Sequence, residues 1–96
     1  MFVVSLTYKT EISEVEKHIE AHIAYLEKYY AAEKFIASGR KVPRTGGVIL
    51  VNMDDRAELD RILAEDPFSI ADVAYYDVTE FVPTMVGKGF ESLKRS

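Results

Sequence analysis

Two ionisable side chains stand where apolar residues would be expected, and their chemistry suggests proton transfer. His22 lies inside an apolar helical stripe, and Asp66 occupies the next position on the stripe of a second, shorter helix. A buried imidazole is unfavourable unless its ring nitrogens find partners. A carboxylate that holds one ring nitrogen leaves the other free to move a proton near neutral pH. We predict His22 and Asp66 as a catalytic pair, although spacing alone does not establish contact.

Structural roles would also explain these residues. Asp66 precedes Pro67, which is the pattern of an N-cap residue before a short helix over residues 67–71. A histidine on an apolar stripe is more often a hydrogen-bonded core residue than a catalyst. His18 and His22 have the spacing of a metal chelate, but a metal site needs a third ligand and the glutamate of the zinc-protease pattern is absent. We therefore expect no metal and no cofactor.

A second group of polar residues concentrates cations around a glycine. An arginine fork beside bare backbone suits a carboxylate or phosphate on a small substrate. The alternative is the solvated rim of a hairpin, which we favour for Lys41. The predicted substrate-binding residues are Ser38, Gly39, Arg40 and Arg44. Most tyrosines are expected in the core or an interface, although one phenol could line the site: Tyr8, Tyr25, Tyr29, Tyr75 and Tyr76.

Two amphipathic helices are predicted to position these side chains. The first spans Ser13 to Tyr30, because Ser13 and Glu16 have capping-box spacing. Its apolar stripe is formed by Val15, Ile19, Ile23, Leu26 and Tyr30. The second helix begins after Asp54 or Asp55, with Glu58 placed for a capping box if Asp55 is the cap, and Pro67 ends it. Its stripe is formed by Leu59, Ile62 and Leu63.

Four segments read as strands and complete a βαββαβ order. They are residues 2–8, 34–41, 47–52 and 73–82, and residues 42–47 supply the turn of a hairpin. This order predicts a ferredoxin-like α+β fold with both helices on one face of an antiparallel sheet. The later strands are apolar on both faces, so we expect the uncovered face to pack against a second sheet in a homodimer. The tail, residues 86–96, is expected to form a short helix with Phe90 and Leu93 docked on the body.

Composition limits the classes of function. The 96 residues, 48% of them hydrophobic, suit a single domain, residues 1–96, with 84–96 as a tail. Twelve basic residues are scattered among sixteen acidic ones, for a net charge of -4, which argues against a nucleic-acid partner. The chain has no cysteine, so thiolate chemistry is excluded. Neither an export signal nor an apolar run long enough to span a membrane is recognisable, so we expect a cytoplasmic protein without a membrane partner.

Four segments of the chain resemble the YciI-like (YCII-related) family. They are residues 21–26, 34–40, 46–50 and 65–68, and the His-x-x-Tyr-Leu and Asp-Pro-Phe segments are the most specific. The resemblance runs from Phe2 to about Pro83. It implies a dimeric α/β barrel of ferredoxin-like type and a paired histidine and aspartate, at His22 and Asp66 in this chain.

Two departures from the family pattern concern anion binding. Arg40 follows Gly39 where many members have proline, and Ile19 and Glu20 stand where many have an arginine. The anion-binding group would then be Arg40 or Arg44.

Two hypotheses for function remain open. The first is an enzyme of lyase, isomerase or hydrolase type that acts on a small anionic or aromatic substrate through His22 and Asp66. The alternative is a non-catalytic ligand-binding or dimeric scaffold protein, in which the pair is only structural. The family does not decide the substrate, because relatives include a dehydrochlorinase-like enzyme of aromatic degradation alongside many proteins of unknown role.

Overall fold

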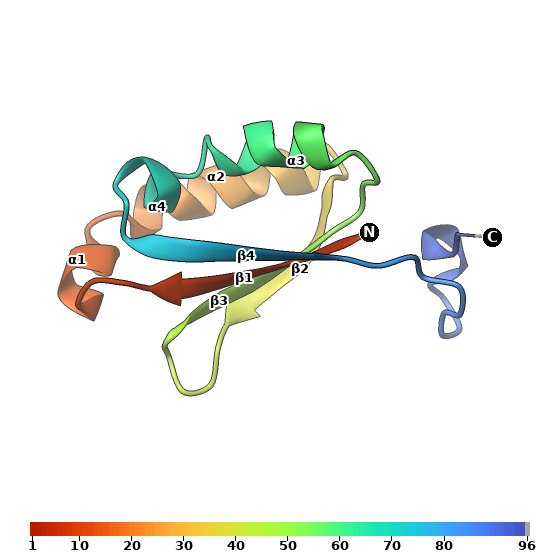
Figure 1. Ribbon diagram of the computed structural model, residues 1–96, viewed down its shortest axis with the longest axis horizontal. Helices are drawn as coiled ribbons and strands as arrows, with labels where there is room; N and C mark the ends of the chain where they lie inside the picture. Colours follow the sequence, from red (N-terminus) through yellow and green to blue (C-terminus); the bar gives the residue numbers. More distant parts are fainter. Residues whose placement is uncertain (96) are drawn as a thin grey trace.

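The computed structural model describes residues 1–95 and shows a four-stranded antiparallel sheet with helices on one face (Figure 1). Its strands are β1 (Phe2–Tyr8), β2 (Phe35–Arg40), β3 (Gly46–Val51) and β4 (Ala74–Glu80). Their order across the sheet is β2-β3-β1-β4, and β2 and β3 form the predicted hairpin. This order matches the ferredoxin-like plan, so the predicted α+β fold is confirmed.

The helical layer departs from the prediction at its start. The elements are α1 (Ile12–Glu16), α2 (Ile19–Ala31), α3 (Arg56–Leu63) and α4 (Pro67–Ile70). The predicted single helix from Ser13 to Tyr30 is wrong, because the chain turns at residues 17 and 18 and separates α1 from α2. The capping box at Ser13 is wrong as well. Ser13 lies inside α1, whose N-cap residue, Glu11, makes no side-chain cap bond.

The core lies between the helices and the sheet face that carries Phe2, Val4 and Leu6, all of which are buried. On α2 the buried residues are Tyr25 and Tyr29. The predicted apolar stripe of this helix does not coincide with the face that is buried. Ile23 is 47% exposed, whereas Ile19, Leu26 and Tyr30 are partly buried and pack against the core. The face of α2 that meets the core is the one that carries Tyr25 and Tyr29, whose rings pack against Phe35.

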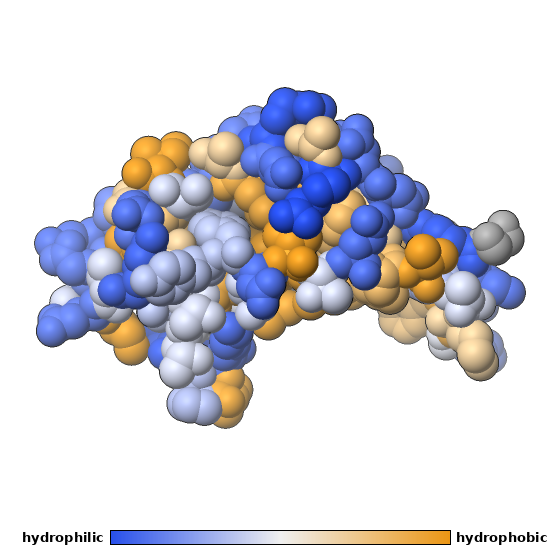
Figure 2. All heavy atoms as spheres, viewed as in Figure 1, coloured by the Kyte–Doolittle hydropathy of each residue, from blue (hydrophilic) through white to orange (hydrophobic). Residues whose placement is uncertain are grey.

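The opposite sheet face is open and less apolar than predicted. Strand alternation places Val3, Leu50 and Tyr75 on it, and Tyr75 is 61% exposed. The same alternation places Ser5 and Asp77 on this face. In the isolated chain β4 is therefore buried on one face only, contrary to the prediction. In the view of Figure 2, hydrophilic side chains cover α3, and apolar ones appear along the lower edge of the body.

Capping residues position the second helical segment. The carboxylate of Asp55 accepts hydrogen bonds from the amides of Ala57 at 3.0 Å and Glu58 at 3.4 Å, so Asp55 is the N-cap residue of α3. The Glu58 side chain does not complete the predicted capping box but pairs with Lys34 at 3.3 Å.

Within the part of the chain that the structure describes, no helix combines the length and apolar character needed to cross a bilayer.

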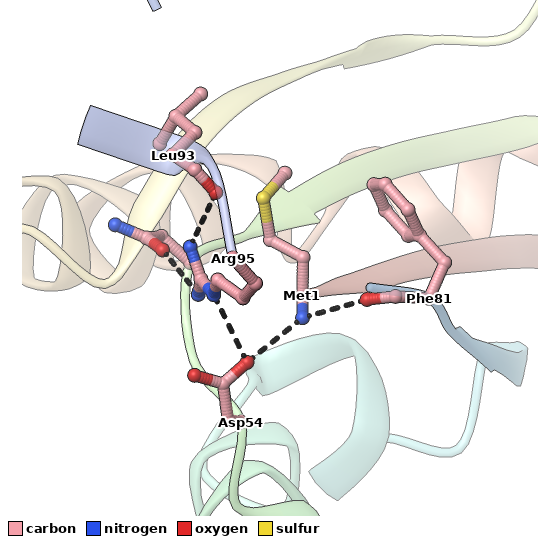
Figure 3. A network of polar contacts seen from close by, with 6 residues as sticks. Met1, Asp54, Phe81, Leu93 and Arg95 are labelled. Carbon is pink, nitrogen blue, oxygen red and sulfur yellow. Dashed lines mark hydrogen bonds and ion pairs between the residues drawn. The ribbon is translucent and has the colours of Figure 1, made fainter. Parts of the chain in front are cut away.

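The tail extends beyond β4 and returns to the body at one point (Figures 1 and 3). It contains a single 3-10 turn, η1 (Glu91–Leu93), in place of the predicted helix, and Phe90 is 56% exposed rather than docked. Arg95 instead donates to Asn52 at 2.8 Å and to Asp54 at 3.3 Å. The amino group of Met1 also reaches Asp54, at 3.1 Å. Ser96, part of the predicted tail, lies outside the described residues.

Candidate active site

Asp66 occupies the junction between α3 and α4 and is fully buried. It is the N-cap residue of α4, since its Oδ1 accepts a hydrogen bond from the amide of Phe68 at 3.0 Å. The same oxygen lies 2.7 Å from Nδ1 of His22, and Oδ2 accepts a hydrogen bond of 2.5 Å from the Tyr76 hydroxyl. Asp66 therefore both caps α4 and contacts His22. The sequence alone left open whether Asp66 was only a cap or also part of a site.

His22 projects from α2 between Asp66 and a hollow. Its ring stacks on Phe68, with the centroids 3.9 Å apart and the planes 5° from parallel. The side chain is 14% exposed. Among residues 1–95 every buried side-chain nitrogen or oxygen has a hydrogen-bond partner, and Nε2 of His22 makes no hydrogen bond. Nε2 is thus accessible to solvent, while Nδ1 is held by Asp66.

A cavity of about 440 Å³ adjoins the histidine, a volume in the range of small-molecule sites. It lies between α2, the β2–β3 hairpin and α4. All four residues predicted to bind substrate line it together with His22, whereas Asp66 lies behind the histidine and does not. The remaining lining residues are mostly apolar: Leu6, Tyr8, Ile19, Ile23, Leu26, Gly46, Gly47, Val48, Ile49 and Phe68.

The lining of the cavity is positively charged. It includes Arg40 and Arg44, and none of its described residues is acidic. Arg44 pairs with Glu16 of α1 at 3.4 Å, whereas Arg40 has no carboxylate within ion-pairing distance among residues 1–95. Lys41 turns away and donates to Thr7 at 3.1 Å. The Ser38 hydroxyl is hydrogen-bonded to Tyr30 at 2.6 Å. The arrangement suits a small molecule with an anionic group and an apolar body.

Two phenols beside Asp66 remain protonated at neutral pH. Burial, together with the hydrogen bond to Asp66, raises the pKa of Tyr76. Burial and the negative charge of Asp66 likewise raise the pKa of Tyr25, whose hydroxyl donates to the carbonyl of Ile62 at 2.9 Å. Both hydroxyls therefore act as hydrogen-bond donors within the core.

Sequence reasoning gave Phe68 no role in the site and named Tyr76 only as one of five tyrosines that could line it. Tyr8 is the one of these that lines the cavity, whereas Tyr76 contacts Asp66 behind it. Strand alternation predicts that Tyr76 shares a face with Ala74 and Val78, and the sheet topology shows that this face meets the helices. No spacing rule connects position 76 with position 66, because the contact depends on how β4 lies under α4.

The metal chelate considered for His18 and His22 finds no support in the structure. His18 is the N-cap residue of α2 and does not line the cavity. Residues 1–95 hold no group of three metal-ligating side chains.

Comparisons with known proteins agree with this fold. The family model of the YCII-related domain matches residues 1–82. One similar solved structure is that of 5-chloro-2-hydroxyhydroquinone dehydrochlorinase (TftG) from Burkholderia phenoliruptrix AC1100, in complex with 2,5-dihydroxybenzoquinone. The two share 20% sequence identity and superpose with a TM-score of 0.73, over 85% of this chain and 93% of that one. No protein of curated function matches in sequence. From the extent of the family match, this chain belongs to the YCII-related family.

Proposed function

We propose that this protein is an enzyme in which His22 transfers a proton through Nε2 while Asp66 holds Nδ1. One observation carries the proposal: Nδ1 lies 2.7 Å from a fully buried carboxylate, while the opposite ring nitrogen is accessible beside a cavity. A histidine that served only the core would have both nitrogens enclosed. The geometry is that of a general base supported by an acidic partner.

In the proposed reaction, Nε2 accepts a proton from a hydroxyl or an activated carbon of the substrate. The electron pair left behind forms a double bond as a leaving group departs, or shifts the position of an existing one. The resulting imidazolium is stabilised by the Asp66 carboxylate, and Nε2 then returns the proton to the product or to water. Lyase and isomerase chemistry follow directly. In hydrolase chemistry Nε2 would deprotonate a water molecule, whose oxygen would attack the substrate, and the imidazolium would return the proton to the leaving group as its bond breaks.

We propose a small anionic or aromatic substrate, bound by Ser38, Gly39, Arg40 and Arg44. Arg40 supports this assignment best, because no carboxylate among residues 1–95 competes for its guanidinium. The apolar lining residues would enclose the body of such a molecule. The similar dehydrochlorinase structure contains 2,5-dihydroxybenzoquinone, a planar ring with acidic hydroxyls, which makes this compound a suitable probe.

We also propose that the protein acts as a homodimer that joins the open sheet faces, as in the dimeric barrel that the family resemblance implies. Val3, Leu50 and Tyr75 on that face support it, since each is at least partly exposed in the single chain. A cytoplasmic location remains an expectation.

The decisive experiment compares the protein with its His22→Asn variant, using 2,5-dihydroxybenzoquinone as the probe. Asparagine keeps an amide nitrogen near the position of Nδ1, to bond with Asp66, but has no atom at Nε2. Calorimetry would measure binding, and NMR in D2O would measure exchange of the ring hydrogens, which requires proton transfer. We expect the parent protein to accelerate exchange and the variant to lose about 100-fold or more of it.

Two controls make the result interpretable. His18→Asn alters the other histidine, which lies outside the cavity, and should leave exchange unchanged. His22→Ala should also abolish binding or exchange, but it removes a donor to the buried Asp66 and should lower thermal stability, so His22→Asn is the variant that isolates the role of Nε2. Binding without accelerated exchange by the parent protein would favour the non-catalytic alternative. A collapse of stability in both His22 variants, together with neither binding nor accelerated exchange by the parent protein, would show that the ring is only a core residue.

A further inference from the structure

We propose that Tyr76 is a positioning residue that sets the tautomer of His22 by acting through Asp66. The inference deepens the proposed function and rests on it for its catalytic consequence. Its structural basis is a chain of contacts from the sheet to the cavity. The Tyr76 hydroxyl lies 2.5 Å from Oδ2 of Asp66, and Oδ1 lies 2.7 Å from Nδ1 of His22.

The hydrogen bonds of Asp66 determine where the hydrogens lie. Phe68 offers an amide, which only donates, to Oδ1 at 3.0 Å. Tyr76 has no other hydrogen-bond partner among residues 1–95, and its distance to Oδ2 is typical of a hydroxyl donating to a carboxylate. Both oxygens of Asp66 therefore accept hydrogen bonds, as those of a carboxylate do.

The tautomer of the ring follows from this arrangement. A carboxylate that accepts hydrogen bonds through both oxygens favours a hydrogen on Nδ1 of His22, which then donates to Oδ1. The neutral ring then has its lone pair at Nε2, the nitrogen that is accessible beside the cavity. Without the Tyr76 hydroxyl, Oδ2 would be buried without a donor, which disfavours a carboxylate that only accepts hydrogen bonds. Asp66 would then favour a hydrogen on Nδ1 of His22 less strongly.

Two features separate Tyr76 from a residue that only fills space. Asp66 is fully buried, so water cannot replace a missing donor. Tyr25 offers a matched comparison, because its hydroxyl also makes a buried hydrogen bond in the same core but donates to the carbonyl of Ile62 and not to Asp66. Loss of either hydroxyl should cost similar stability, whereas only loss of the Tyr76 hydroxyl should alter the ring.

The test is nitrogen-15 NMR of the imidazole of His22, at a pH where the ring is neutral, in the parent protein and in Tyr76→Phe and Tyr25→Phe. We expect the parent and Tyr25→Phe rings to carry hydrogen on Nδ1 alone. In Tyr76→Phe we expect a mixture of tautomers, with ring-hydrogen exchange of 2,5-dihydroxybenzoquinone slowed about tenfold or more. A parent ring with hydrogen on Nε2 would overturn the proposal without any variant, even if Tyr76→Phe failed to fold.

An Asp66→Asn background separates direct from indirect action. If Tyr76 acts through the carboxylate, Tyr76→Phe should add no tautomer change to Asp66→Asn, and an additive change would refute that route. The proposed function fails on a different observation: a parent protein with the expected tautomer but no accelerated exchange. In that case Tyr76 would still set the tautomer, but of a ring that transfers no proton.

Discussion

At the scale of single residues, Glu65 secures the junction that carries Asp66. Its carboxylate accepts hydrogen bonds from the Tyr29 hydroxyl at 2.6 Å and from the Lys28 ammonium at 3.0 Å. These two contacts, the Tyr29 hydroxyl foremost, lower the pKa of Glu65 below its usual range. Since Tyr29 and Lys28 belong to α2, the contacts hold the end of α3 against the helix that carries His22.

This pKa shift predicts a dependence of stability on pH. A carboxyl group with a lower pKa in the folded chain stabilises the fold fully above the unfolded glutamate pKa of about 4.3. The contribution is lost as the pH falls through the lower folded value. Glu65→Gln should therefore lower the melting temperature at pH 7 and make little difference near pH 3. Thermal denaturation at several pH values would check this.

A matched variant on α2 serves as the control. Glu27 is exposed and makes no hydrogen bond or ion pair with residues 1–95, so Glu27→Gln should leave the melting temperature unchanged at both pH values. An equal loss in the two variants, or a Glu65→Gln effect that persists at pH 3, would contradict the assignment of the stabilisation to the ionised carboxylate.

At the scale of elements, the pairing of β1 with β3 depends on Gly46. A Cβ atom at this position would lie 1.8 Å from the carbonyl oxygen of Leu6, which is backbone and cannot move aside alone. Gly46 also lines the cavity. The glycine therefore allows the hairpin to approach the central strand at the point where the predicted substrate-binding residues meet the rest of the site.

Gly46→Ala should destabilise the fold by about 2–3 kcal/mol, because the added methyl group forces the two strands apart. Chemical denaturation would measure the loss. Gly39→Ala on the neighbouring strand is the control, since a Cβ there meets nothing within 4 Å. It should change stability by well under about 1 kcal/mol. Equal effects of the two substitutions would contradict this packing argument.

At the scale of the whole molecule, the open sheet face predicts a dimer. Light scattering at micromolar concentration should give twice the 10.9 kDa mass of the chain. Leu50→Lys places a charge on the open face and should shift the equilibrium to monomer with the fold retained. Ile70→Lys, at a 73% exposed position on the helical side, should leave the dimer intact. A monomeric parent protein would refute the proposal.

Local patterns were sufficient for most of the architecture. Alternation over residues 2–8 predicts β1 with its inward face, and Asp55 and Asp66 carry N-cap signals that the structure confirms. Such signals depend on neighbours within a few residues, so they can be read without knowledge of the fold. The capping-box signal at Ser13 misled because it describes a possible helix start, whereas the observed α1 begins one residue earlier and ends after Glu16.

The candidate site shows the same difference between what local patterns predict and what depends on tertiary packing. From residue types alone, the sequence determined that His22 and Asp66 need partners and that a hairpin carries arginines beside a glycine. Only the tertiary structure decided that Asp66 contacts His22, that Tyr76 completes the carboxylate's hydrogen bonds, and that Arg40 faces the same cavity. These contacts join residues up to 44 positions apart. They depend on how the sheet and helices pack, which no local pattern encodes.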